Sequence, residues 1–150
     1  MSWRRRVLGA VTSVDASPAY LSAAQGEAER QGYADRVTYR HGDFVALASD
    51  VATADIVTLD RVVCCYHDMR ALVRLSSERA GRLYGLVYPR DRWWMKAARA
   101  VMNVSFWTVR HPFRFFVHAT ADVDALARAS GLAPRFTGKT LLWQVVVYGR

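Results

Sequence analysis

The chain has 150 residues, of which 52% are hydrophobic, and its formal net charge is +8. This length fits one domain, and the apolar content excludes a globally disordered chain. No run of 18 apolar residues occurs, which excludes a helix that spans a membrane, and the short, interrupted apolar stretch after the basic start is a poor signal peptide. The positive charge leaves acidic ligands, nucleic acid and anionic membrane surfaces as partner classes.

The first predicted elements are a strand, a helix and a second strand. Val11–Asp15 is β-rich and predicts a strand that ends in an acid. Ser17 and Pro18 predict a helix start, with the serine as N-cap and the proline in the first turn, and Gly32 is a plausible C-cap. The stretch Arg36–Phe44, which contains Gly42-Asp43, predicts the second strand.

The middle of the chain repeats the strand–helix–strand pattern. Ala54–His67 opens with the apolar run Ile56–Leu59, which is typical of a parallel strand covered on both faces. Asp68–Gly81 has helical spacing of apolar residues, and Arg82–Pro89 predicts another strand.

The last third begins with a long aromatic and basic segment, Arg90–Val117. A helix follows over Thr120–Gly131, with Thr120 as the expected N-cap. The remaining residues predict two antiparallel β stretches around Gly138. Alternation of strands and helices predicts a single α/β domain over residues 1–150, with a mostly parallel sheet and an antiparallel C-terminal hairpin.

Three acids stand at predicted strand ends: Asp15, Asp43 and Asp60. Ligands of open α/β sheets bind beyond the carboxyl ends of the strands. Aspartate is also common at strand ends and helix N-caps for structural reasons alone. Because three acids end three consecutive β units on one rim, we favour a ligand site.

These motifs together resemble the class I, Rossmann-like methyltransferases that use S-adenosylmethionine. The segment VTSVDASPAYLSAAQ resembles the family's second strand and its acid, and VTYRHGDF resembles its third. ADIVTLDRVVCCYHD aligns with the fourth, with Asp55 and Asp68 in the positions of two family acids. The resemblance covers roughly residues 11–150 and implies a three-layer Rossmann-like sandwich.

The resemblance also implies which residues hold S-adenosylmethionine. Asp15, with Ala16 beside it, takes the position that binds the ribose hydroxyls, and one carboxylate can accept both of them. Asp43, with Gly42 before it, takes the position that binds the adenine amino group. Phe44 or Val45 would cover the adenine, and Asp60 with Arg61 would flank the methionine moiety.

One family motif is missing, because no G-x-G loop occurs anywhere in the sequence. The family's first strand, which is central between the second and the fourth, precedes that loop. We therefore expect this strand and its loop to lie upstream of Met1 and the domain to be incomplete.

The leading hypothesis is thus a methyltransferase that acts on an unidentified small-molecule acceptor. Because the domain is expected to be incomplete, this hypothesis does not imply that the chain itself is active. The alternatives are a non-catalytic remnant, a basic nucleic-acid-binding module that uses residues 90–114, and a dinucleotide oxidoreductase. We expect a small-molecule partner rather than nucleic acid or a membrane surface, and a cytoplasmic location, since two cysteines without metal spacing indicate a reducing compartment.

Other reactive residues give weaker signals. His67 and Tyr66 are the candidates for a proton acceptor or a substrate contact. For Cys64 and Cys65 we favour small buried residues over a catalytic thiol, and a disulfide between neighbours would be strained. The four histidines share no short spacing, so we expect no metal site.

The segment 90–117 permits three interpretations: a helix packed on the sheet, a lid over the acceptor, and a membrane-interface helix. Helical spacing places one apolar and one polar face in it. The expected apolar face is Trp94, Ala97, Ala98, Val101, Met102 and Ser105; the other face is Arg92, Lys96, Arg99 and Asn103.

Overall fold

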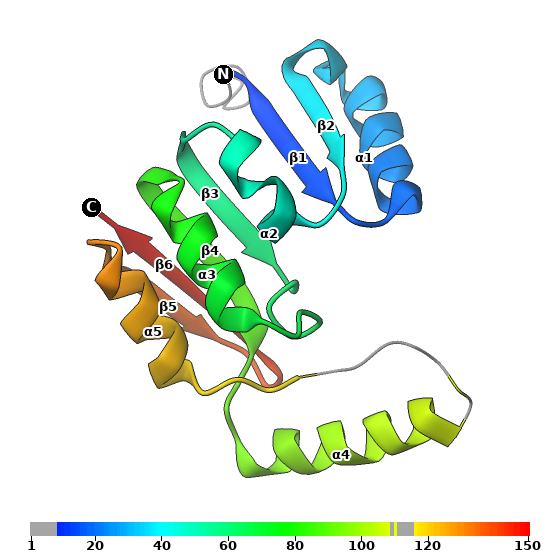
Figure 1. Cartoon of the computed structure of the whole chain (residues 1–150), viewed down its shortest axis with the longest axis vertical. Helices are drawn as coiled ribbons and strands as arrows, with labels where there is room; N and C mark the ends of the chain where they lie inside the picture. The colour runs from blue at the N-terminus through cyan, green and yellow to red at the C-terminus, as the bar shows by residue number, and fades with distance from the viewer. Residues whose placement is uncertain (1–8, 109, 111–115) are drawn as a thin grey trace. The chain divides into compact units, whose positions relative to one another are not determined.

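The computed structural model describes residues 9–108, 110 and 116–150. The chain divides between Val51 and Ala52 into two compact units (Figure 1). Each unit has its own sheet, with two strands in the first unit and four in the second. The expectation of a single domain remains a prediction.

The first unit contains a parallel strand pair joined by a helix. Strands β1 and β2 pair in register from Val11 with Val37 to Asp15 with His41. Its elements are β1 (Val11–Asp15), α1 (Pro18–Gln31), η2 (Ala34–Arg36), β2 (Val37–His41), α2 (Phe44–Leu47) and η3 (Ala48–Asp50). The only hydrophobic side chains that it buries among the described residues are Ala28 and Ala48.

Local sequence signals define α1 as predicted. The Ser17 side chain accepts a hydrogen bond from the Tyr20 N–H, Pro18 opens the helix, and Gly32 ends it at φ 75°. The predicted second strand was too long, because the strand ends at His41. Asp43 instead caps α2, its carboxylate accepting from the Val45 N–H at 2.9 Å.

The second unit carries a mixed sheet in the order β3-β4-β6-β5. Strands β3 and β4 are parallel, whereas β6 is antiparallel to both of its neighbours, which confirms the predicted C-terminal hairpin. Its elements are β3 (Ala54–Asp60), α3 (Met69–Glu78), β4 (Ala80–Pro89), α4 (Trp93–Thr108), α5 (Thr120–Ala129), β5 (Ala133–Lys139) and β6 (Trp143–Gly149).

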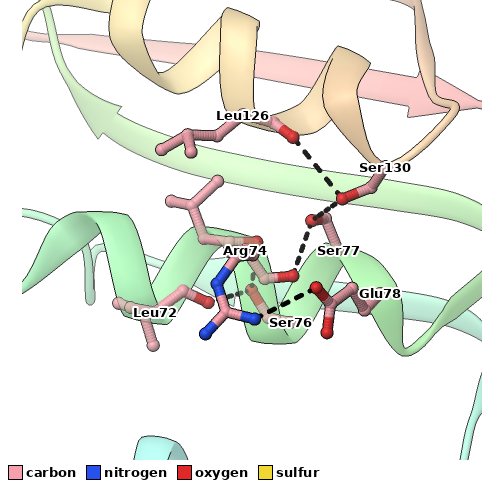
Figure 2. A network of polar contacts seen from close by, with 8 residues as sticks. Leu72, Arg74, Ser76, Ser77, Glu78, Leu126 and Ser130 are labelled. Carbon is pink, nitrogen blue, oxygen red and sulfur yellow. Dashed lines mark hydrogen bonds and ion pairs between the residues drawn. The ribbon is translucent and has the colours of Figure 1, made fainter.

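The core of the second unit lies where α3 and α5 pack with β4 and β6. Tyr84 and Tyr148 are almost fully buried, and their ring centroids are 6.3 Å apart. The Ser76 hydroxyl meets the Tyr84 hydroxyl at 2.7 Å. Ser77 of α3 contacts Ser130, which follows α5, at 2.8 Å, so polar contacts join the two helices (Figure 2).

Three expectations about this unit were wrong. Ile56 is 48% exposed, so β3 is not covered on both faces; within its unit it is an edge strand paired only with β4. Ala119, not Thr120, is the N-cap of α5, because the Ala119 carbonyl accepts the first helical hydrogen bond, from the Val123 N–H at 3.3 Å; the Thr120 hydroxyl instead accepts from the buried Gln144 amide at 2.8 Å. Gly138 lies inside β5 rather than in the turn.

The hairpin turn falls instead at residues 140–142. Thr140 closes it, its N–H donating to the Trp143 carbonyl at 2.8 Å and its hydroxyl accepting from the Trp143 N–H at 3.1 Å. These two bonds give partners to backbone groups of Thr140 and Trp143, which lie beyond the last β5–β6 pair, Lys139 with Gln144.

Candidate functional site

The carboxyl end of the first unit's strand pair carries two of the predicted acids. Asp15 is the last residue of β1, and its backbone carbonyl accepts a hydrogen bond from the Gly42 N–H at 3.0 Å. That bond holds the turn containing Asp43 against the end of β1. Asp15 and Asp43 therefore stand on one rim, as the strand-end pattern predicts.

Both acids also have local structural roles. One carboxylate oxygen of Asp15 accepts from the Ser17 N–H at 2.7 Å, while Asp43 caps α2. Since an ionised carboxylate offers about four acceptor positions, one backbone bond leaves Asp15 capacity for a hydroxyl-bearing ligand. The bond from Ser17 orients the Asp15 carboxylate without using up its acceptor capacity, and the capping bond orients the Asp43 carboxylate.

Gly42 is required by the shape of this turn. Its φ is 146°, a conformation that L side chains rarely adopt, and an added Cβ would lie 2.9 Å from Leu47 Cδ1. Beside it, the His41 ring contacts the Ala16 carbonyl at 3.1 Å, which ties the two strand exits together. Phe44, the predicted adenine cover, is half-buried as the first residue of α2.

The carboxyl end of β3 in the second unit carries the other predicted pair. Asp60 and Arg61 form an ion pair with an Nε–Oδ1 distance of 3.3 Å, and both side chains are more than half exposed. Such an exposed pair adds little stability. Arg61 has a φ of 57°, which is rare for a residue with a side chain and typical of strained positions at binding sites.

Trp143 is a neighbour of this pair that the sequence did not indicate. The Arg61 guanidinium lies 5.9 Å from the centroid of the Trp143 ring, within the range of a cation–π contact. Trp143 starts β6, far along the chain from Arg61. No local spacing links them, and only the pairing of β6 with β4, next to β3, brings them together.

The loop after β3 holds the two cysteines, which are both free thiols. Cys64 is buried, as predicted, while Cys65 is exposed, contrary to the prediction. Burial, followed by the neighbouring Cys65, raises the pKa of the Cys64 thiol to about 12. Cys64 is therefore a protonated thiol at neutral pH, which argues against a thiolate nucleophile at this position.

The same loop carries Tyr66 and His67, whose rings stack with centroids 5.0 Å apart. His118 lies against this loop and is a further candidate that the sequence did not single out. Burial lowers the pKa of His118, and its hydrogen bonds to backbone groups of Val63 and Tyr66 only partly oppose that effect. His118 is thus neutral at pH 7 and able to accept a proton.

The predicted residues fall into two groups, one in each unit. The rim of β1 and β2 carries Asp15, Ala16, Gly42, Asp43 and Phe44, whereas the end of β3 and the loop after it carry Asp60, Arg61, Tyr66 and His67. His111 lies outside the described residues. Among the described residues, no group of three or more His, Cys, Asp or Glu side chains could hold a metal ion. No described helix is long and apolar enough to cross a membrane.

Comparison with known proteins gives the context for these two groups. Residues 1–77 match a family model described as methyltransferase domain. No curated protein matches the chain. Solved structures do match, but all those described below are under 25% identical and so bear on the fold alone.

One match is magnesium protoporphyrin IX methyltransferase from Synechocystis PCC 6803 with bound SAH, at a TM-score of 0.72 and 19% identity, covering 94% of this chain and 64% of that one. Another is a putative sarcosine dimethylglycine methyltransferase from Galdieria sulphuraria, at a TM-score of 0.68 and 9% identity, covering 93% of this chain and 69% of that one. This chain thus spans less than two thirds of the first structure. The predicted Rossmann-like α/β fold is confirmed.

Proposed function

This chain belongs to the methyltransferase-domain family, whose model matches residues 1–77, and from that premise we propose that it binds S-adenosylmethionine for methyl transfer to a small-molecule acceptor. The observation that carries the proposal is the pair Asp15 and Asp43 on one rim, joined by the hydrogen bond from Gly42 to the Asp15 carbonyl. Those two side chains have the chemistry that the nucleoside part of the cofactor requires.

The available groups fit the cofactor in kind. A ribose diol presents two hydroxyl donors and adenine presents an amine donor, and carboxylates accept both. Asp15 is proposed to bind the ribose and Asp43 the adenine amine, with Ala16 and Gly42 keeping the backbone close and Phe44 giving apolar cover. Asp60 and Arg61 are proposed to bind near the methionine moiety.

The cofactor supplies an electrophilic methyl group on a sulfonium, so the protein's contribution is mainly to position and orient the reactants. The acceptor must lose a proton if the attacking atom is a hydroxyl or amine. His67 and Tyr66 stay candidates to take that proton. His118 joins them because its ring lies against the backbone of Val63 and Tyr66 in the same loop.

Support for a small-molecule acceptor comes from the relatives. Proteins of similar fold include methyltransferases of magnesium protoporphyrin IX and of geranyl diphosphate, and an O-methyltransferase family 2 protein in complex with apigenin. These three molecules share no chemistry beyond being small. We therefore propose the acceptor class and not its identity.

The first test is calorimetric titration of the purified chain with S-adenosylhomocysteine, the demethylated product of the cofactor. We expect saturable binding that Asp15→Asn and Asp43→Asn each weaken about 10- to 100-fold, the value of a lost charge-assisted hydrogen bond. Asparagine keeps an oxygen for the backbone bonds that Asp15 and Asp43 accept, so the turns are preserved.

Asp35→Asn is the matched control. Asp35 is an exposed acid in the same unit, but it lies before β2 and so at the opposite end of that strand. The control should bind like the parent chain. Equal binding by the Asp15 variant would refute the assignment, and a cooperatively folded parent chain that does not bind at all would favour the non-catalytic interpretation.

A further inference from the structure

Helix α4 presents apolar side chains on two sides. Met95 is buried, and Met102 and Phe106 on the same side are half-buried. The other side is exposed to solvent, and there Trp93 is 79% exposed, Val101 69%, Val104 59% and Trp107 70%. The apolar face expected from the sequence divides between the two sides, because Val101 is exposed whereas Met102 is half-buried.

The exposed residues form one continuous stripe. At about 100° of rotation per residue, Trp93, Ala97, Val101, Val104 and Trp107 fall within an arc of about 120°. We call these five residues the α4 stripe. Its two tryptophans are separated by about 21 Å along the helix axis.

A helix that is apolar on opposite sides is normally covered on both of them. The α4 stripe is left open, and a contiguous exposed apolar patch usually marks an interaction site. The helix is too short and its flanks too basic for a transmembrane span, consistent with no described helix being able to cross a membrane. The geometry favours a helix that lies along a surface.

Charge identifies the kind of surface. The 16 residues of α4 include no aspartate or glutamate, and exposed arginines stand at both ends: Arg92 before the helix and Arg110 after it. The Arg110 N–H donates to the Trp107 carbonyl at 3.0 Å, which keeps that arginine next to the stripe. The whole chain carries a net charge of +8.

These charges argue against two other occupants. A second copy of the chain would bring the same arginines together and create like-charge repulsion. Nucleic acid would favour cations along the middle of the contact, where its phosphates run, but the middle of the stripe holds Ala97, Val101 and Val104. An anionic lipid bilayer satisfies both parts, because the boundary between its headgroups and acyl chains accepts the tryptophans and valines of one helix face and its phosphates accept the arginines.

We propose that the α4 stripe binds the surface of an anionic lipid bilayer, with α4 in the plane of the interface. Trp93 and Trp107 enter the boundary between headgroups and acyl chains together with Val101 and Val104, and Arg92 and Arg110 contact lipid phosphates. Interfacial helices lie in this way with one apolar face in the membrane; in α4 the opposite face, which includes Met95, is buried in the protein instead of being polar. The proposal rests on α4 alone and is independent of cofactor binding by the first unit.

Co-sedimentation of the full chain with vesicles tests the proposal. Vesicles of phosphatidylcholine with phosphatidylglycerol should retain the protein, and vesicles of phosphatidylcholine alone should retain it much less. The double variant Trp93→Ser with Trp107→Ser should reduce the partition coefficient at least about tenfold, because two large apolar side chains no longer leave water. Arg92→Gln and Arg110→Gln should each reduce it about fivefold.

Tyr20→Ser and Arg82→Gln are the matched controls, since both side chains are exposed and lie on other elements. Tyr20→Ser should leave the partition coefficient unchanged. Arg82→Gln should reduce the partition coefficient by no more than the general effect of losing one positive charge. Circular dichroism checks that each variant keeps its helices. The stripe residues are on the surface, so the core is not disturbed.

Loss of vesicle binding in the Trp93 and Trp107 double variant, with Tyr20→Ser unaffected, supports the proposal. Vesicle binding that the double variant retains in full overturns it. Stripe-dependent binding to single-stranded nucleic acid without vesicle binding also overturns it, as does a stripe-dependent dimer that ignores lipid.

Discussion

The Ser76–Tyr84 contact offers a quantitative test of the packing in the second unit. Both residues are fully buried, and their hydroxyl oxygens are 2.7 Å apart. The Ser76 hydroxyl donates to the Leu72 carbonyl at 2.6 Å, so the Tyr84 hydroxyl must donate to Ser76. The serine thus serves as the acceptor for a buried phenol.

Removing the acceptor and removing the donor have different expected costs. Ser76→Ala leaves the Tyr84 hydroxyl buried without its acceptor, at about 1–3 kcal/mol, of which alanine's better helix propensity recovers about 0.5 kcal/mol. Tyr84→Phe removes one ordinary hydrogen bond and costs about 0.5–1.5 kcal/mol. In the double variant neither hydroxyl remains, so the loss should not exceed that of Ser76→Ala alone.

Urea denaturation followed by circular dichroism at pH 7 measures these free energies of unfolding. Burial raises the pKa of Tyr84, so the phenol is neutral at this pH. Ser105→Ala is the control, because its hydroxyl makes the same kind of bond, to the Val101 carbonyl at 3.0 Å, on an exposed helix surface; it should change stability by less than about 0.5 kcal/mol. Strictly additive losses in the Ser76 and Tyr84 double variant would refute the reasoning.

Three further predictions concern the site. Iodoacetamide at pH 8 should modify exposed Cys65 and spare buried Cys64, whose pKa is raised to about 12; mass spectrometry of the native protein checks this, and equal labelling would contradict it. NMR titration should find the pKa of His118 below the usual value of about 6.5, because burial lowers it. Below pH 6.5 the unfolded chain therefore binds a proton at this residue more readily than the folded chain does. The contribution of His118 to the free energy of unfolding is thus present above pH 6.5 and lost below it, and His118→Gln should remove this pH dependence. Gly42→Ala should destabilise by about 1–3 kcal/mol through its φ of 146° and its close approach to Leu47, with thermal unfolding as the measurement and an unchanged midpoint as the contrary result.

The acid positions of the candidate site could be predicted because they depend on strand ends, which local sequence defines. Asp15 does end β1, Asp60 does end β3, and Asp43 follows β2 through the Gly42 turn. The neighbours of these acids could not be predicted in the same way. Trp143 and His118 reach the loop after β3 from distant parts of the chain, through sheet order and packing, and no spacing in the sequence encodes that contact.

The sequence by itself determined the α/β class, the α1 caps at Ser17 and Gly32, and the antiparallel hairpin, since all of these rest on short-range periodicity and backbone preference. Only the tertiary structure decided where polar groups find partners and which faces are covered. The Thr120 hydroxyl, predicted to cap α5, instead gives the buried Gln144 amide a hydrogen-bond acceptor. The open side of α4 was likewise not readable from helical spacing, because a helix with apolar residues on two sides does not specify which side the rest of the fold covers.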